Sequence, residues 1–420
     1  MISGLRVFVR AVFRTTVIAA TVLGASAQAT ESSATRAASP GPGVELDFCQ
    51  PGTAIEHRSA AWWASASRLL AGMDLPEQSP MSSIGDRKSV VDHREHLGAL
   101  WASFDSKRLQ PIRDFAGREL AAIPGNAPVF YPFSGPDAAY APAFFPAASE
   151  FIFTGLEPVG EVPDLRALDD ATLTTSLDRL RNSLRSVLAL SFFVTLEMDS
   201  DLRRNKLSGV TPILMLFLAR HGYDVNAVEP FVLEADGSLC HARAERVKDI
   251  RSTDLRIPGV VVRFQRPGDP HERRIVYLKT DLSNAGLQKR PQYLRFVDAI
   301  NPQTTLIKSA SYLLHLKEFT TLRDHVLLHS QVILQDDTGV PLKLYKAAQW
   351  EQRLYGAYVG PIPIFRTRYQ PEMSTAYREM AHPLGFGIGY RYESHESNLQ
   401  LFLRRTNKVV ATAGKRASMD

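Results

Sequence analysis

The sequence predicts an α/β fold with a mostly parallel, Rossmann-like sheet. Short apolar runs, typical of buried strands, alternate with longer segments in which apolar residues recur at helical spacing. This repetition of strand, helix and strand favours parallel strands joined by helical crossovers. The predicted strands of the body cover residues 129–133, 150–157, 260–264, 275–279, 304–308 and 332–334.

Helical spacing of apolar residues also predicts the helices. Pro111 should divide the stretch 90–122 into two helices, because proline interrupts helical hydrogen bonding. Other predicted helical segments are 59–73, 138–145, 173–198, 212–221, 291–300, 312–315 and 319–329. Towards the C-terminus we expect strands over 386–392 and 399–403, and residues 342–345 could return as the hairpin partner of strand 332–334.

These elements suggest five successive segments, because a leader rich in small and polar residues separates the N-terminus from the folded part. They are a signal peptide (1–29), a flexible leader (30–58), a helical preface (59–126), the α/β body (127–348) and a β-containing C-terminal addition (349–420).

The N-terminus has the three zones of a secretory signal. A positive start without acidic residues precedes an apolar run, 15–25, that is too short to cross a bilayer, and Ala27–Ala29 form an A-x-A cleavage site. An uncleaved anchor is the alternative, because Phe8 and Val9 lengthen the apolar stretch. No transmembrane segment is expected after cleavage, so we expect a soluble periplasmic or secreted protein.

The charge of the chain argues against one class of partner, and its two cysteines allow one disulfide. The net charge is +5, and the signal peptide carries three arginines and no acidic residue, which leaves the mature chain near +2. No block of lysine and arginine is interleaved with aromatic residues, so nucleic acid is not an expected partner. Cys49 and Cys240 could form one disulfide in an oxidising compartment, and two unpaired thiols are the alternative.

Polar clusters follow five of the predicted strands. If those strands are parallel, the clusters lie along one edge of the sheet, where open α/β sheets bind their ligands. The alternative for each cluster is ordinary turn and helix-cap chemistry. The candidate ligand-binding residues are Ser134, Gly135, Asp137, Glu157, Asp281, Ser283, Asn284, Lys308, Ser311, Tyr312, Asp336 and Asp337.

The first strand–helix–strand unit resembles the opening of the class I methyltransferase-like, Rossmann-type fold. Gly135 follows the first strand, and an acidic residue, Glu157, stands about 20 residues later. Only one glycine is present, and Pro136 removes an amide that could face a phosphate. S-adenosylmethionine and NAD are not expected outside the cytoplasm, so the resemblance implies architecture without methyl transfer and leaves the cofactor unknown.

Four short strings resemble an uncharacterised family of exported bacterial proteins. They are FYPFSGPD at 130–137, GLEPVG at 155–160, SASYLLH at 309–315 and LQDDTGVP at 334–341. The resemblance covers most of the chain after Ala127. It implies no activity.

Two histidine pairs and an acidic turn are the candidate metal ligands in the sequence. His93 and His96 lack the i, i+4 spacing of helical zinc ligands. His325 and His329 have that spacing, but neighbouring leucines favour a packed helix whose polar side they complete, so no metal is predicted. Asp336 and its neighbour Asp337 lack the regular oxygen spacing of a calcium loop, which favours a turn or a carboxylate pair.

Two classes of function remain open. In a binding module, Asp137, Glu157, Asp281 and Asp336 would hydrogen-bond a small polar molecule. In an extracytoplasmic hydrolase or transferase, Asp336 or Asp337 would act as acid or base, with Lys308 or Ser134 in the chemistry. C-terminal tyrosines could also contact sugars or a cell-envelope partner, although half-buried β residues are the favoured interpretation: Tyr355, Tyr358, Tyr369, Tyr377, Tyr390 and Tyr392.

Overall fold

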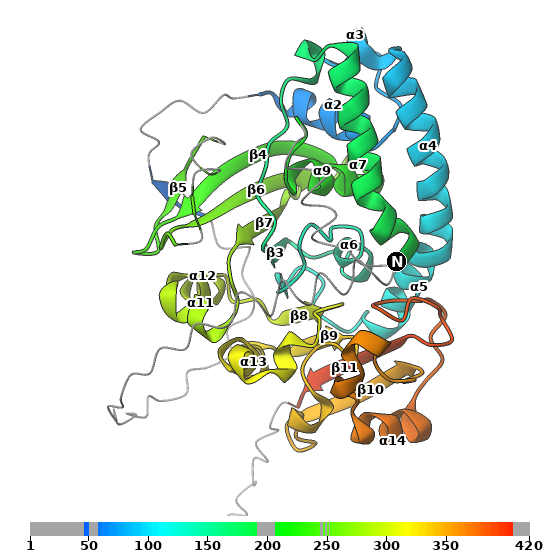
Figure 1. The fold of residues 1–420 in the computed structure, drawn as a ribbon, viewed down its shortest axis with the longest axis vertical. Coiled ribbons are helices and arrows are strands. Elements are labelled where there is room, and N and C mark those ends of the chain that lie inside the picture. The colour runs from blue at the N-terminus through cyan, green and yellow to red at the C-terminus, as the bar shows by residue number, and fades with distance from the viewer. Residues whose placement is uncertain are drawn as a thin grey trace, which may run out of the picture.

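One large mixed sheet forms the centre of the protein (Figure 1). The computed structural model describes residues 46–49, 58–190, 206–243, 247, 250–251 and 253–405. The sheet has eleven strands in the order β1-β5-β4-β6-β7-β3-β2-β8-β9-β11-β10. The predicted signal peptide lies outside the described residues.

The central strands are parallel, as predicted. β7, β3, β2, β8 and β9 pair side by side in this order, and every pairing among them is parallel. Numbered along the chain, the order is 3-2-1-4-5, which reverses direction beside the first strand as in doubly wound folds. The strands are β2 (Val129–Tyr131), β3 (Glu150–Gly155), β7 (Arg273–Lys279), β8 (Thr304–Ile307) and β9 (Val332–Gln335).

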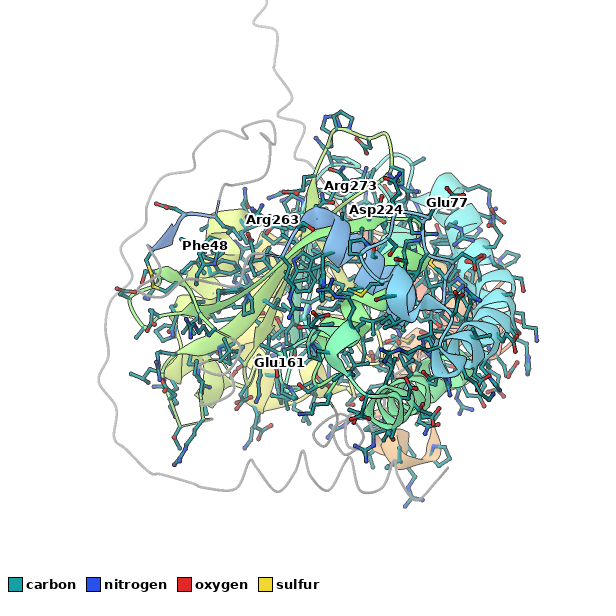
Figure 2. All side chains as sticks on the ribbon, turned by 90° about the horizontal axis from the view of Figure 1, so that it is seen from above. Phe48, Glu77, Glu161, Asp224, Arg263 and Arg273 are labelled. Carbon is teal, nitrogen blue, oxygen red and sulfur yellow. A yellow bond between two sulfur atoms is a disulfide. The ribbon has the colours of Figure 1, made fainter. Side chains whose placement is uncertain are left out.

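Antiparallel pairings extend this parallel centre on both sides. Beyond β7, β6 pairs antiparallel to β7 and β4 pairs antiparallel to β6; beyond β9 lie β11 and β10. Phe48, in β1, lies at the far edge, whereas Arg263 lies along β6 (Figure 2). The added strands are β1 (Phe48–Cys49), β4 (Asp224–Leu233), β5 (Leu239–His241), β6 (Ile257–Gln265), β10 (Trp350–Gly356) and β11 (Asn398–Arg404).

Helices cover the two faces of the sheet, and the strand residues alternate between them. In β2, Val129 and Tyr131 belong to one apolar core, whereas Phe130 belongs to the other. The first core is covered by α2 (Ala60–Leu70), α4 (Lys88–Phe104), α5 (Gln110–Glu119), α7 (Asp170–Leu190) and α9 (Thr211–Arg220). The second is covered by α11 (Asn284–Lys289), α12 (Gln292–Ile300), α13 (Thr320–His329) and α14 (Pro371–Met380).

Several short helices lie between the longer elements. A π-helical turn, Asp105–Leu109, joins α4 to α5, and Pro111 lies in the first turn of α5, where its missing amide costs little. The other short helices are α3 (Ser82–Gly85), α6 (Ala141–Phe144) and the 3-10 turns Leu165–Ala167, Leu313–His315, Lys317–Phe319, Leu342–Leu344 and Pro363–Arg368.

The predictions of two β segments are wrong. Residues 386–392 form no strand and contribute only an isolated bridge between Ile388 and Arg391. The segment 342–345 forms a 3-10 turn instead of a hairpin partner. The physical reason is that β8 and β11 already occupy both sides of β9, so β9 has no free edge for a hairpin strand.

The connection from β10 to β11 lies at the carboxyl edge of the central strands, where the predicted polar clusters also lie. Because β11 is antiparallel to both β9 and β10, β10 points the same way as the central strands. Residues 357–397 therefore leave the sheet and rejoin it at the carboxyl edge. Among the described residues, no helix is long and apolar enough to cross a membrane.

Candidate functional site

Neighbouring loops at the carboxyl edge contact one another through the predicted residues. The loop after β2 meets the loop after β8 through Asp137 and Lys308. The loop after β8 meets the loop after β9 where the Ser309 amide donates to Asp336. The loop after β3 lies against the loop after β2, because a Cβ on Gly135 would be 3.4 Å from the Glu157 carboxylate oxygens. Four of the five predicted clusters are therefore in contact, and the cluster after β7 is the exception.

A buried ion pair lies between the ends of β2 and β8. Lys308 Nζ is 2.9 Å from Asp137 Oδ2, and each side chain is 3% exposed. Tyr131 donates a hydrogen bond to the same oxygen at 2.8 Å. The Lys308 ammonium also lies 4.1 Å from the ring centroid of Tyr140, at cation–π distance. These contacts supply the partners that buried charges require.

Two adjacent buried carboxylates follow β9. Asp336 accepts hydrogen bonds from the backbone amides of Ser309, at 2.8 Å, and Thr338, at 2.9 Å. Asp337 accepts from the hydroxyl of Tyr312 and, at 3.1 Å, from the side-chain amide of Asn398. Burial raises the pKa of both carboxyl groups, and with the added charge of Asp337 the pKa of Asp336 reaches about 6.

The raised pKa of Asp336 predicts a pH dependence of stability. Between about pH 4 and about pH 6, the native carboxyl holds a proton that the unfolded chain has lost. The free energy of unfolding should therefore fall as pH rises through this window, by about 3 kcal/mol from this group, and then level off. Urea titrations from pH 4 to pH 8 measure this, and Asp336→Asn should lack that part of the slope. An equal slope in the variant would contradict the assignment.

Backbone strain is concentrated in the same loops. Phe133, Ser309, Ser311 and Tyr312 have left-handed φ values of 61°, 52°, 51° and 55°. Within the described part of the chain, Asn301 is the one other non-glycine residue with positive φ. Such conformations cost of order 1–3 kcal/mol each and persist only where surrounding contacts hold them. Here these residues follow β2 and β8, the strands on either side of the point where the sheet order reverses.

The loops after β2 and β3 are held by close backbone contacts. Ser134 accepts a hydrogen bond from the Thr154 amide at 3.0 Å, and its own hydroxyl lies near backbone carbonyls. Gly135 adopts φ 52°, and a Cβ there would lie 3.4 Å from the carboxylate oxygens of Glu157. The Glu157 carboxylate therefore lies against Gly135, at a distance where a Cβ would make ordinary van der Waals contact.

The cluster after β7 has a different role. Asp281 accepts from the amide and the hydroxyl of Ser283, both at 2.9 Å, and Ser283 caps α11 by accepting from the Gly286 amide. Asn284 donates to the Lys317 carbonyl and to Thr320 at the start of α13. These contacts are turn and cap chemistry that joins two helices. A ligand role for these three residues stays a prediction.

The predicted nucleophiles are already engaged. Lys308 is ion-paired with Asp137, and the Ser134 hydroxyl faces backbone groups. The geometry therefore lends no support to an enzyme that uses either group, although a carboxyl with a pKa near 6 is suited to proton transfer.

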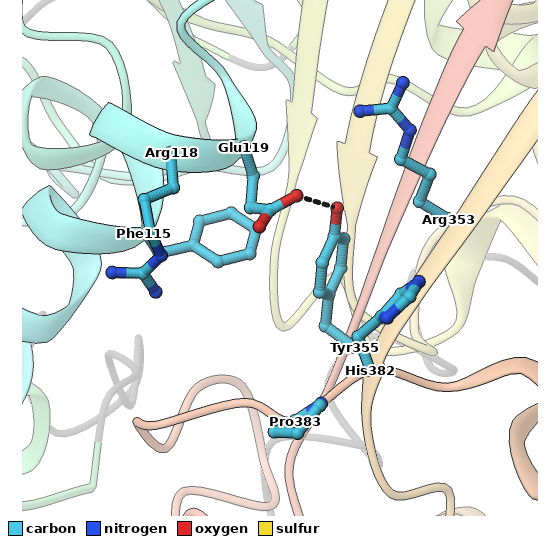
Figure 3. Close-up of a pocket in the computed structure, with 7 residues that line it drawn as sticks. All are labelled: Phe115, Arg118, Glu119, Arg353, Tyr355, His382 and Pro383. Carbon is cyan, nitrogen blue, oxygen red and sulfur yellow. Dashed lines mark hydrogen bonds between the residues drawn. The ribbon is translucent and has the colours of Figure 1, made fainter.

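The sequence did not predict a polar cleft between α5 and β10 (Figure 3). Its volume is about 470 Å³, within the range of small-molecule sites. The Tyr355 hydroxyl donates to Glu119 at 2.7 Å, as the dashed line in Figure 3 shows. The lining residues are Phe115, Arg118, Glu119, Arg353, Tyr355, His382 and Pro383. Tyr355 was the one signal in the sequence, as a member of the C-terminal tyrosine group.

Most of those C-terminal tyrosines are buried. Tyr355, Tyr358, Tyr377 and Tyr390 are each less than 10% exposed, whereas Tyr369 is 50% exposed. Burial of these four rings leaves them little exposed face for sugar stacking. Tyr390 instead reaches the strained loop, where its hydroxyl donates to the Ser309 carbonyl at 3.0 Å.

Comparisons with known proteins add no relative. No protein family, curated protein or solved structure matches this chain. The resemblance to an exported family and to methyltransferase-like proteins therefore stays a prediction.

Proposed function

We propose that this chain is an extracytoplasmic binding protein that holds a small polar ligand at the carboxyl edge of β2, β8 and β9. The observation that carries this proposal is the coincidence of four strained non-glycine residues with buried carboxylates beside the reversal of strand order. Ligands of open α/β sheets bind at this position. Strain and perturbed pKa values concentrate at functional sites.

The chemistry of the site favours a ligand with hydrogen-bond donors. Asp336 and Asp337 offer acceptor oxygens, and the hydroxyls of Ser311 and Tyr390 lie 2.8 Å apart in the neighbouring loops. The Asp137–Lys308 pair joins the loops after β2 and β8. A molecule with several hydroxyl or amino groups, such as a polyol, a sugar or an amine, matches this set of acceptors.

The segment 357–397 controls access in this proposal. Gln370 from this segment lies beside the backbone of Asp337, and Gly389 packs closely against the Asp336 carboxylate. The two carboxylates are 2% and 5% exposed. A ligand can therefore reach them only when this segment shifts, and a bound ligand would be shielded from water.

Two observations support the proposal that the protein functions outside the cytoplasm. The N-terminal sequence has the zones of a cleavable secretory signal. In the folded part, Cys49 and Cys240 form a disulfide, a bond that persists in oxidising compartments.

A thermal-shift screen of the mature chain against polyols, sugars, amino acids and amines tests the proposal. We expect at least one compound to raise the melting temperature, and Asp337→Asn to weaken its binding about 10- to 100-fold, because a hydrogen bond to a charged group contributes about 1.5–3 kcal/mol.

Arg118→Ala is the matched control, because it alters the open cleft beside β10 and leaves the buried carboxylates unchanged. A response lost in Arg118→Ala and retained in Asp337→Asn would place the ligand in the cleft and overturn the proposed site. No response to any compound class would overturn the binding function.

A further inference from the structure

Two histidines and one aspartate converge away from the carboxyl edge. His325 and His329 lie on α13, and Asp298 lies on the neighbouring α12. The three potential ligand atoms lie within 4.8 Å of one another. They line a small pocket with Pro302 and Ser330, which lie two residues before β8 and β9, so this cluster belongs to the amino-terminal side of those strands.

The helix itself sets up the histidine pair. Residues four apart share one face of a helix, and the His325 and His329 rings stack with centroids 4.3 Å apart. His325 is 9% exposed and packs edge-on against the ring of Phe130, which fixes one wall. His329 and Asp298 are 42% and 44% exposed, so the other side opens to solvent.

The distances from Asp298 to the two imidazoles fit a bound ion better than they fit direct hydrogen bonds. Asp298 Oδ1 is 3.7 Å from His325 Nε2 and 3.6 Å from His329 Nδ1. Both separations exceed the usual 2.7–3.2 Å of a hydrogen bond. Ligand atoms around tetrahedral zinc, at about 2.0–2.1 Å from the ion, lie roughly 3.3–3.4 Å apart. A movement of a few tenths of an ångström would bring Asp298 Oδ1 to that spacing from each imidazole nitrogen, and the two imidazole nitrogens lie within 4.8 Å of each other.

We propose that Asp298, His325 and His329 bind a divalent transition metal of the zinc type, with water in the fourth position. Imidazole nitrogen with one carboxylate oxygen is a donor set that suits zinc, nickel and copper and disfavours calcium and magnesium. The other histidine pair shows the contrast: His93 and His96 each face a separate backbone carbonyl, of Leu70 and Asp92, and do not converge.

Zinc titration of the tag-free, disulfide-bonded mature protein tests this site. Both cysteines are bonded to each other, so no thiolate competes for the ion. We expect saturable single-site binding in competition with a chromophoric zinc indicator. We also expect Asp298→Asn and His329→Ala each to weaken the binding by at least about tenfold. Cobalt(II) should give the visible absorption of a tetrahedral site in the wild type alone.

His271→Ala is the matched control, because His271 pairs with Asp269 on the surface as a single imidazole and should leave zinc affinity unchanged. Asp298 and His329 are part-exposed, so their variants should keep the metal-free melting temperature of the wild type. Absence of saturable zinc binding, or equal affinity in His329→Ala, would overturn the proposal and leave a metal-free contact between the two helices.

Discussion

Replacing Lys308 with methionine is expected to lower the free energy of unfolding by about 3–5 kcal/mol. The substitution removes the cation and leaves the Asp137 carboxylate in a site that is 2% exposed, with Tyr131 as a hydrogen-bond donor. Removal of one partner of a buried ion pair costs more than the pair contributes, because the remaining charge stays desolvated. Urea unfolding at pH 7 measures the loss.

Two comparisons separate this effect from loss of packing. Adding Asp137→Asn to Lys308→Met should recover a large part of the stability, because no charge then remains in the dry site. Lys88→Met serves as the matched control, because Lys88 pairs with Asp92 on the surface of α4 and its loss should change stability too little to resolve. A small loss in Lys308→Met, comparable to the control, would show that the pair is hydrated.

The parallel centre of the fold could be predicted because its strands are buried on both faces. Such strands appear as short continuous apolar runs, and β3 shows this in Phe151 and its neighbours Ile152 and Phe153. The crossover rule then makes successive strands parallel. Their common direction, in turn, predicted a shared edge for the polar loops, and four of the five clusters do contact one another there.

The strands β4 and β10 could not be predicted in the same way. β10 contains Glu351, Gln352 and Arg353, and β4 contains Pro230, a residue depleted in strands. Both depend on partners distant in sequence: β4 pairs with β6, and β10 pairs with β11. The opposite error occurred at 386–392, where apolar residues are buried by packing of the 357–397 segment and form no ladder.

Prediction of the candidate sites was limited in the same way, because some of their residues come from elements distant in sequence. Spacing alone singled out His325 and His329 as a pair, for which the sequence predicted a packed helix and no metal, and it placed Asp324 beside them. In the structure Asp324 is 71% exposed and lies near Arg323, whereas Asp298 from another helix completes the cluster. A residue contributed by a neighbouring element has no signal in local spacing, because only helix packing brings it close.

Replacing Cys49 and Cys240 together with serine is expected to lower the free energy of unfolding by about 2–5 kcal/mol. The disulfide joins residues 191 positions apart, so its loss frees a long loop in the unfolded chain. Strand β1 has two residues, which pair with β5, and Phe48 stacks on His241 at 4.0 Å. Urea unfolding of the oxidised protein and the variant measures the difference.

Reduction of the wild type provides the control for this prediction, because a thiol reductant should lower its stability to that of the variant and leave the variant unchanged. Phe48→Ala, which keeps the bridge, should cost much less, since it removes only packing against His241 and Phe231. If reduction left the stability of the wild type unchanged, the bridge would be dispensable. A loss of several kcal/mol would mean that the chain reaches full stability only after oxidation, which agrees with folding outside the cytoplasm.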